Sequence, residues 1–334
     1  GRRQGAPQGA LRWGWRWRRA RPSLVRSPEF SGPSAPEEAR APAQSYRGIT
    51  VSVAAGKGGT GKTLVATSLA ISLATTGRSV QLLDCDVEEP NAALLLRPKI
   101  DKSDRVTVLC PTVDEETCTG CGLCARTCQF SAIAAMRGKV ITFPNLCVGC
   151  GACAYVCPTD AITEVPRPVG VVEHGVTAEG IDFWHGRVDV GILRSGLVLA
   201  AVKGQADAAR IVIIDAPPGT ACPMQEALAD SDFCLLITEP TPFGLSDLGA
   251  AVETCHALSL PCAVILNRAG DDDAAVQSYC DEHGLPLLLR IPEERRIAEA
   301  YSRGETLVQA FPQWRPRLIE ALETALAHVQ CDET

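Results

Sequence analysis

Two groups of residues in this chain have the types and spacings that chemistry requires. One is a glycine-rich loop with two lysines, Gly56-Lys57-Gly58-Gly59-Thr60-Gly61-Lys62-Thr63. The other is the stretch from Cys118 to Cys157, which contains eight of the sixteen cysteines. The loop predicts a site for phosphate groups, and the cysteines predict a metal centre.

The glycine-rich loop lies in the context of a P-loop, between an apolar strand expected at 49–54 and a helix expected at 64–76. Glycines let successive backbone N–H groups turn inward around phosphate oxygens, and the helix N-terminus adds its positive dipole end. We therefore expect Lys62 to neutralise the β- and γ-phosphates and the Thr63 hydroxyl to bind Mg²⁺. The nucleotide-binding residues of the loop would be Gly56, Gly58, Gly59, Thr60, Gly61, Lys62 and Thr63.

Two further apolar strands, expected at 79–84 and 210–215, end in acidic residues. The carboxyl ends of buried parallel strands are where α/β sheets place their chemistry. We expect Asp215 to hold the Mg²⁺ shell as a Walker B carboxylate. Asp86, in the sequence Asp84-Cys85-Asp86, would orient or activate the attacking water.

The eight clustered cysteines form an internal repeat, in which Cys-x2-Cys-x2-Cys-x3-Cys occurs twice with an offset of 29 residues. This is the spacing of a two-cluster bacterial ferredoxin, in which the fourth cysteine of each run binds the other cluster. Zinc is the competing metal, but its sites usually show paired CxxC or Cys/His at longer intervals. The expected [4Fe–4S] ligand sets are Cys118, Cys121, Cys124 and Cys157 for one cluster, and Cys147, Cys150, Cys153 and Cys128 for the other.

Strands and helices alternate outside the cysteine-rich stretch, which predicts an α/β fold with a doubly wound, mostly parallel sheet. We expect a discontinuous P-loop ATPase domain at 48–108 and 166–331, with a small α+β ferredoxin-like insert at 109–165. Residues 166–189 would return to the main sheet as short strands, with a turn at Asp182–Gly186. Further strands are expected at 233–238, 262–266 and 287–291, and helices at 197–203, from about 245, around 293–301 and at 314–329.

Composition and charge restrict the possible partners. Residues 1–47 hold ten arginines and three glutamates, which gives this segment a net charge of +7. Because the whole chain has a net charge of −7, the remainder carries −14. An acidic body gives no reason to expect nucleic-acid binding, and no apolar run is long enough for a membrane span. We interpret 1–47 as a disordered basic extension, although its Arg/Trp mixture could also contact anionic lipid or nucleic acid. Clustered CxxC spacing argues against a secreted disulfide framework, so we expect a cytoplasmic protein.

The loop carries a second lysine, Lys57, directly after its first glycine, and so resembles the deviant Walker A motif of the MinD/ParA/Mrp superfamily. The sequences around Asp84, Asp215 and Asn267-Arg268 resemble other motifs of these ATPases. With the eight-cysteine insert, the chain resembles superfamily members that carry an inserted ferredoxin domain. The resemblance implies an ATP-sandwich homodimer in which Lys57 reaches the nucleotide of the opposite subunit. It also implies adenine contacts from Asn267 and Arg268.

Together these features predict an ATPase that uses ATP, Mg²⁺ and two [4Fe–4S] clusters. Closure of the dimer would be coupled to electron transfer to an unidentified redox or iron–sulfur client protein. One alternative is an iron–sulfur scaffold or carrier of the Mrp type, although eight cysteines in a ferredoxin arrangement favour stable redox clusters. A second alternative is a nucleotide-gated docking protein that does not hydrolyse ATP and whose clusters are structural.

Overall fold

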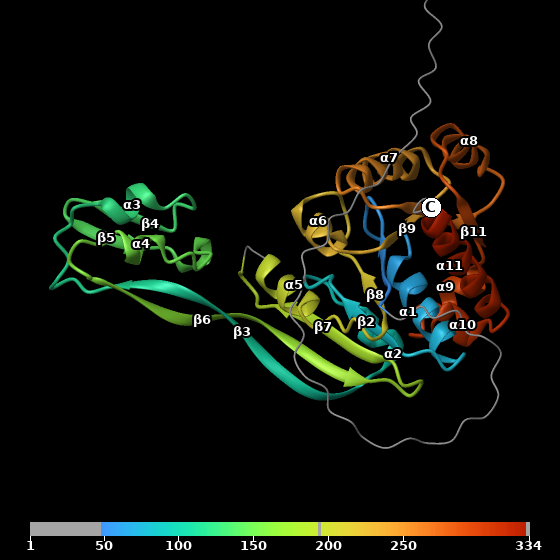
Figure 1. Cartoon of the computed structure of the whole chain (residues 1–334), viewed down its shortest axis with the longest axis horizontal. Helices are drawn as coiled ribbons and strands as arrows, with labels where there is room; N and C mark the ends of the chain where they lie inside the picture. The colour runs from blue at the N-terminus through green and yellow to red at the C-terminus, as the bar shows by residue number, and fades with distance from the viewer. Residues whose placement is uncertain (1–47, 193–194, 332–334) are drawn as a thin grey trace, which may run out of the picture.

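The computed structural model describes residues 48–192 and 195–331, which form a large body and a smaller lobe joined by a long two-stranded ribbon (Figure 1). The expected disordered extension, 1–47, lies outside the described residues. The strands of the main sheet are β1 (Thr50–Ala54), β2 (Val80–Asp84), β3 (Lys99–Val113), β6 (Ile162–Val176), β7 (Asp182–Val188), β8 (Ile211–Asp215), β9 (Phe233–Thr238), β10 (Cys262–Ala269) and β11 (Leu287–Pro292).

The nine strands lie in the order β11-β10-β9-β1-β8-β2-β7-β6-β3. Every pair from β11 across to β7 is parallel, whereas β6 is antiparallel to β7 and to β3. The mostly parallel α/β sheet expected from the sequence is therefore confirmed. The strands and helices expected at 49–54, 64–76, 79–84, 197–203, 210–215, 233–238, 262–266, 287–291, 293–301 and 314–329 are present with shifts of a few residues at their ends.

Helices cover both faces of the sheet because successive strand residues point to opposite sides. On one face, Val53 and Ile213 lie in a core shared with α1 and α11, and on the other Ile214 and Leu236 lie in a core shared with α5, α6 and α7. The helices of the body are α1 (Lys62–Ala74), α2 (Ala92–Leu96), α5 (Gly196–Lys203), α6 (Cys222–Leu228), α7 (Pro242–Ala257), α8 (Ala274–His283), α9 (Arg295–Ser302), α10 (Leu307–Ala310) and α11 (Trp314–Cys331).

The ribbon consists of β3 and β6, which pair along their whole length from Lys99↔Val176 to Val113↔Ile162. Only 170–176 of β6 also pair with β7, so 162–169 project beyond the sheet with β3 as their one paired strand. Eight residues at about 3.4 Å each give a projection of about 27 Å. Gly170 is opposite Val188, the last residue of β7. Because β7 is parallel to β2, the ribbon leaves the sheet at the carboxyl edge of the parallel strands.

Two expectations for residues 166–189 were wrong. Residues 162–176 form one long strand instead of short ones, and Asp182–Gly186 lies within strand β7 instead of a turn. Gly186 allows close packing here, because a Cβ atom would come within 2.7 Å of the Val198 and Val202 side chains of α5. Phe183, with no exposed surface, fills the core from the other side of the strand.

The lobe at the tip of the ribbon, residues 114–161, contains all eight clustered cysteines and is called the cysteine lobe below. Its elements are α3 (Leu123–Thr127), α4 (Ala152–Tyr155), the hairpin β4 (Ile133–Met136) and β5 (Lys139–Thr142), and the 3₁₀ turn η1 (Pro144–Leu146). Its two halves repeat one backbone pattern, with positive φ at Gly120 and Gly122 in the first and at Gly149 and Gly151 in the second. The domain boundaries expected at 109 and 165 fall within the ribbon strands, just outside this lobe.

Candidate functional site

The P-loop joins the end of β1 to the start of α1, at the carboxyl edge of the sheet. Gly61, at the helix N-cap, has φ of 96°, and a Cβ atom there would lie 2.4 Å from the side-chain nitrogen of Asn267. Glycine is required at this position for both reasons. Asn267, at 7% exposure, donates a hydrogen bond of 2.7 Å from Nδ2 to the carbonyl oxygen of Thr60. The expected adenine-contacting residue therefore also fixes the P-loop from β10.

A cavity of about 640 Å³, open to solvent, lies beside the P-loop. This volume is within the usual 300–1,000 Å³ of small-molecule sites and has room for a nucleotide. Among the residues expected at the site, the cavity is lined by Gly58, Gly59, Gly61, Lys62, Thr63, Asp86, Asn267 and Arg268.

The remaining expected residues lie around this cavity without lining it. Thr60 and Asp215 are buried, with 2% and 1% exposure, and neither lines the cavity. Gly56 lies against α7, where a Cβ atom would meet the backbone oxygen of Asp247 at 2.2 Å. Lys57 points elsewhere, to an acidic partner described below.

The carboxylate of Asp215 is buried at the end of β8, and both its oxygens lack a hydrogen-bond partner among the described residues. Burial raises its pKa to about 6, although the Thr63 hydroxyl and the Lys62 ammonium act in the opposite direction. Mg²⁺ prefers oxygen ligands, and the two Asp215 oxygens without a hydrogen-bond partner lie beside the Thr63 hydroxyl. The residues present therefore fit a Mg²⁺ shell.

Asp84, which the sequence did not single out as a site residue, is opposite Asp215 on the adjacent strand. Its Oδ1 accepts a hydrogen bond from the Asp86 N–H at 3.1 Å, and its Oδ2 accepts one from the Ala92 N–H at 3.0 Å. These bonds hold the loop that carries Asp86. Burial raises the pKa of Asp86 above its usual value, although the nearby Lys62 ammonium acts in the opposite direction.

Lys57 forms an ion pair with Glu239, at 3.1 Å between Nζ and Oε2. Arg268 approaches the other oxygen of the same carboxylate, at 2.7 Å between Nη1 and Oε1. Sequence spacing gave no signal for Glu239, because it follows β9 as a single acid before a proline. A part in the site was also not predicted for the segment that begins at the end of β11. Its residues that line the nucleotide cavity are Pro292, Glu293, Glu294, Arg295, Ile297, Ala298 and Tyr301.

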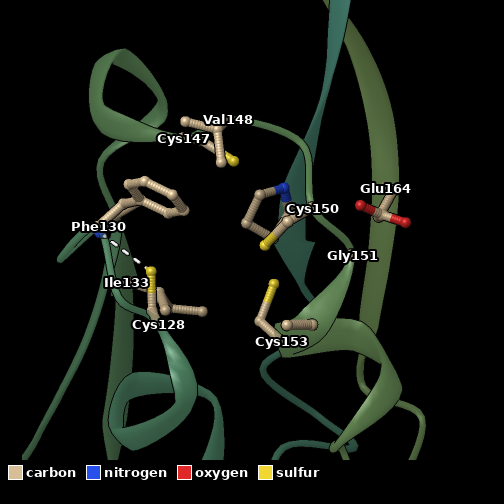
Figure 2. Close-up of a pocket in the computed structure, with 12 residues that line it drawn as sticks. Cys128, Phe130, Ile133, Cys147, Val148, Cys150, Gly151, Cys153 and Glu164 are labelled. Carbon is tan, nitrogen blue, oxygen red and sulfur yellow. Dashed lines mark hydrogen bonds between the residues drawn. The ribbon is translucent and has the colours of Figure 1, made fainter. Parts of the chain in front are cut away.

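The eight cysteines line two cavities of the cysteine lobe, four to each. Figure 2 shows one cavity, where Cys128 of the first run faces Cys147, Cys150 and Cys153 of the second. The other cavity is lined by Cys157 of the second run together with Cys118, Cys121 and Cys124 of the first. The structure thus brings together the two crossed sets that the spacing predicts.

The surroundings of the sulfur atoms are apolar, with backbone N–H donors. Ile133 and Phe130 line the first cavity, and Ile162 and Val140 line the second. The Ala132 N–H donates to Cys128 Sγ at 3.3 Å, the hydrogen bond drawn in Figure 2, and the Gly149 N–H donates to Cys147 Sγ at 3.4 Å. Such donors stabilise thiolate charge.

Among the described residues, no group of three or more His, Cys, Asp or Glu side chains is arranged to hold a single metal ion. A single zinc ion with bonds of about 2.3 Å would need its four sulfurs to converge on one point. In a four-iron cluster each cysteine binds a different iron, so the sulfurs stand apart around a common space. Four cysteines line each of the two cavities, which is the number that either kind of site requires.

Within the described part of the chain, every helix is too short or too polar to cross a bilayer.

Comparisons with known proteins agree with the nucleotide site. A family model described as the CobQ/CobB/MinD/ParA nucleotide binding domain matches residues 51–308. An uncharacterized protein of Methanocaldococcus jannaschii is 35% identical over 229 residues, which cover 67% of this chain and 80% of the relative. An iron–sulfur cluster carrier protein of Aquifex aeolicus is 26% identical over 287 residues, which cover 78% of this chain and 62% of the carrier.

Among solved structures, a variant of Cyanothece McdA in complex with ATP aligns with a TM-score of 0.50 and 16% identity, covering 84% of this chain and 97% of that one. At this identity the likeness concerns the fold alone. The family match extends over most of the chain and includes the P-loop, both acidic strand ends and Asn267. The chain therefore belongs to the CobQ/CobB/MinD/ParA family of nucleotide-binding P-loop ATPases.

Proposed function

We propose that this protein is an ATP-hydrolysing homodimer that couples nucleotide-driven closure to electron transfer through two [4Fe–4S] clusters. The observation that carries the proposal is the ribbon. It connects the two cysteine cavities to the carboxyl edge of the sheet, which also holds the nucleotide cavity. A change at the nucleotide therefore occurs at the same edge of the sheet as the base of the ribbon.

In the nucleotide site, each residue has a distinct task. Lys62 and the P-loop N–H groups hold the phosphates, while Thr63 and Asp215 supply oxygen ligands for Mg²⁺. Asp86 orients the attacking water. Lys57 supplies positive charge to the γ-phosphate of the partner protomer, as an arginine finger does. Its absence from the lining of its own cavity supports a role in trans.

In the cysteine lobe, the two crossed sets of four thiolates would each hold one cluster. A bound [4Fe–4S] cluster supplies one-electron redox chemistry at a potential set by its surroundings. The apolar lining limits water near the sulfurs, and the N–H donors from Ala132 and Gly149 offset their negative charge. Cys121 and Cys150, one from each set, are exposed, which gives a client access to both centres.

A short chain of backbone contacts links the nucleotide site to the base of the ribbon and supports the coupling. Val87, next to Asp86, accepts a hydrogen bond of 3.0 Å from the Val188 N–H at the end of β7. The next residue, Asp189, donates from its N–H to the Val169 carbonyl on β6, also at 3.0 Å. Val169 is the residue at which the ribbon leaves the sheet. Movement of the Asp86 loop on nucleotide binding would thus reach the base of the ribbon directly.

Anaerobically purified protein tests this function. The expected result is about eight irons per chain, reversible reduction of both clusters, and ATP hydrolysis that rises when an oxidised client that can accept electrons is present. Clusters whose spectra, potentials and electron-transfer rates are the same with and without Mg-ATP would contradict the proposed coupling.

The resemblance to an iron–sulfur cluster carrier protein makes transfer of a cluster the second candidate. Incubation with an apo-acceptor protein separates the two functions. Reversible reduction without loss of iron supports electron transfer, whereas stoichiometric movement of iron and sulfide to the acceptor supports a carrier. Negligible hydrolysis in the presence of client would instead favour a docking protein.

A further inference from the structure

The carboxylate of Glu239 holds two cations at the rim of the nucleotide site. Its Oε2 lies 3.1 Å from Lys57 Nζ, and its Oε1 lies 2.7 Å from Arg268 Nη1. The Glu239 side chain is only 7% exposed, whereas those of Lys57 and Arg268 are 33% and 54% exposed. The anion is therefore the fixed member of this group, and the two long cationic side chains are the members that can move.

The backbone around Glu239 is also fixed. Its carbonyl oxygen accepts a hydrogen bond of 2.8 Å from the Thr241 N–H, and a Cβ atom on Gly244 would come within 2.4 Å of that oxygen. Thr238, just before it, donates from its hydroxyl to the Gly244 carbonyl at 2.9 Å. The backbone that carries this carboxylate is thus fixed by the turn between β9 and α7.

The contact to Lys57 conflicts with the task proposed for this lysine. To reach the nucleotide of a partner protomer, Lys57 has to leave the carboxylate of its own chain. Arg268 makes this departure possible, because it remains to neutralise the buried Glu239. Arg268 also lines the nucleotide cavity and approaches the Gly59 carbonyl at 3.5 Å, so a nucleotide in the cavity would lie next to this group of charges.

We infer that Glu239 restrains Lys57 within its own protomer when nucleotide is absent, and thereby opposes closure of the dimer until ATP is bound. This inference rests on the proposed role of Lys57 in trans. Glu239 is a positioning residue in this scheme, since it acts through Lys57 and does not contact the reacting atoms. The free-energy cost of breaking the ion pair between Glu239 and Lys57 would then have to be met before the dimer closes.

The test is dimerisation of the full-length, cluster-loaded protein, measured by analytical ultracentrifugation with a non-hydrolysable ATP analogue and Mg²⁺. Glu239→Gln keeps the shape of the side chain but removes its charge. The expected result is that half of the variant is dimeric at a protein concentration about fivefold lower than the one wild type requires. Glu239→Asp, which keeps the charge, should lie between the two. The matched control is Glu323→Gln, which removes the distant ion pair to Arg78 and should leave dimerisation unchanged.

Two further readouts separate restraint of Lys57 from a general structural effect. Without nucleotide, acylation of Lys57 by an amine-reactive reagent, followed by peptide mass spectrometry, should be several-fold faster in Glu239→Gln. Raising the salt to about 0.5 M should narrow the difference in dimerisation between wild type and variant, because the restraint is ionic and partly exposed. Matching thermal melts for the two proteins would establish that the variant is folded.

Dimerisation of Glu239→Gln that is equal to or weaker than that of wild type would overturn the inference, as would unchanged acylation of Lys57. Lys57→Ala distinguishes this failure from failure of the proposed function. If Lys57→Ala loses hydrolysis while Glu239→Gln behaves as wild type, only the restraint is wrong. If Lys57→Ala hydrolyses ATP normally, the role of Lys57 in trans is wrong, and the inference falls with it.

Discussion

Replacement of Asp215 by asparagine should stabilise the nucleotide-free protein while weakening its response to Mg²⁺ and ATP. The carboxylate is 1% exposed, and its oxygens have no hydrogen-bond partner among the described residues. Burial raises its pKa from 3.8 to about 6. Since a tenfold change in acidity corresponds to about 1.4 kcal/mol, the ionised group costs the folded state about 3 kcal/mol near pH 8.

The sign of the pH dependence follows from linkage. A carboxyl whose pKa is higher in the folded protein favours folding below its unfolded pKa, and this contribution is lost as the pH rises through the folded pKa. Only about half of the cost is therefore present at pH 5. The buried asparagine amide keeps unsatisfied groups that cost about 1 kcal/mol, so the expected net gain is about 2 kcal/mol at pH 8. This corresponds to a rise of about 4 °C in Tm.

The assay is thermal unfolding under anaerobic conditions, at pH 5 and pH 8, in Mg²⁺-free buffer and with Mg-ATP. Asp215→Asn should melt higher than wild type at pH 8 without Mg²⁺, with a smaller advantage at pH 5. Mg-ATP should stabilise wild type, and this added stability should be largely absent from the variant. A variant that melts below wild type at pH 8, or whose advantage grows toward pH 5, would refute the reasoning.

Three other predictions concern the rest of the molecule. Lys57→Ala should retain ATP binding, measured by equilibrium titration, but hydrolyse ATP at least about tenfold more slowly, because a charge supplied in trans acts on the transition state; an unchanged rate would exclude the role. Cys118→Ser and Cys157→Ser should each lose about half of the bound iron, and the double variant no more than that, because both cysteines line one cavity; additive loss would contradict the crossed sets. Burial lowers the pKa of His174, but hydrogen bonds to Asp182 and Asp101 outweigh this effect and raise it overall. His174→Gln should therefore lose about 1 kcal/mol of stability in urea unfolding at pH 5.5 and less at pH 8.5, since the stabilisation is lost as the pH rises through the raised pKa; a larger loss at pH 8.5 would contradict this assignment.

The body of the protein could be predicted from sequence because its parallel strands are buried on both faces. β1, β2, β8 and β9 are almost entirely buried and largely apolar, and the P-loop and Asp215 follow from their ends. The grouping of the cysteines around two cavities could be predicted for a different reason, since the expectation came from the spacing typical of cluster ligands and not from packing.

The ribbon could not be predicted in the same way. The first half of β3, from Lys99 to Arg105, is polar and exposed, so it carries no alternating pattern and depends on its pairing with β6. In β7 the polar residues that suggested a turn have partners across the sheet. Asp182 and His185 bond to His174 and Glu173 of β6. Glu239 was not predicted as a site residue because the two cations that pair with it are distant in sequence.

The most direct test of the central claim is the reduction potential of the two clusters, measured by EPR-monitored titration with and without a non-hydrolysable ATP analogue and Mg²⁺. Coupling predicts a shift in at least one cluster potential or signal on addition of the analogue, and little or no shift in Asp215→Asn, whose response to Mg²⁺ and ATP should be largely absent. Identical titrations of the wild-type protein in both conditions would contradict the coupling of nucleotide state to the clusters.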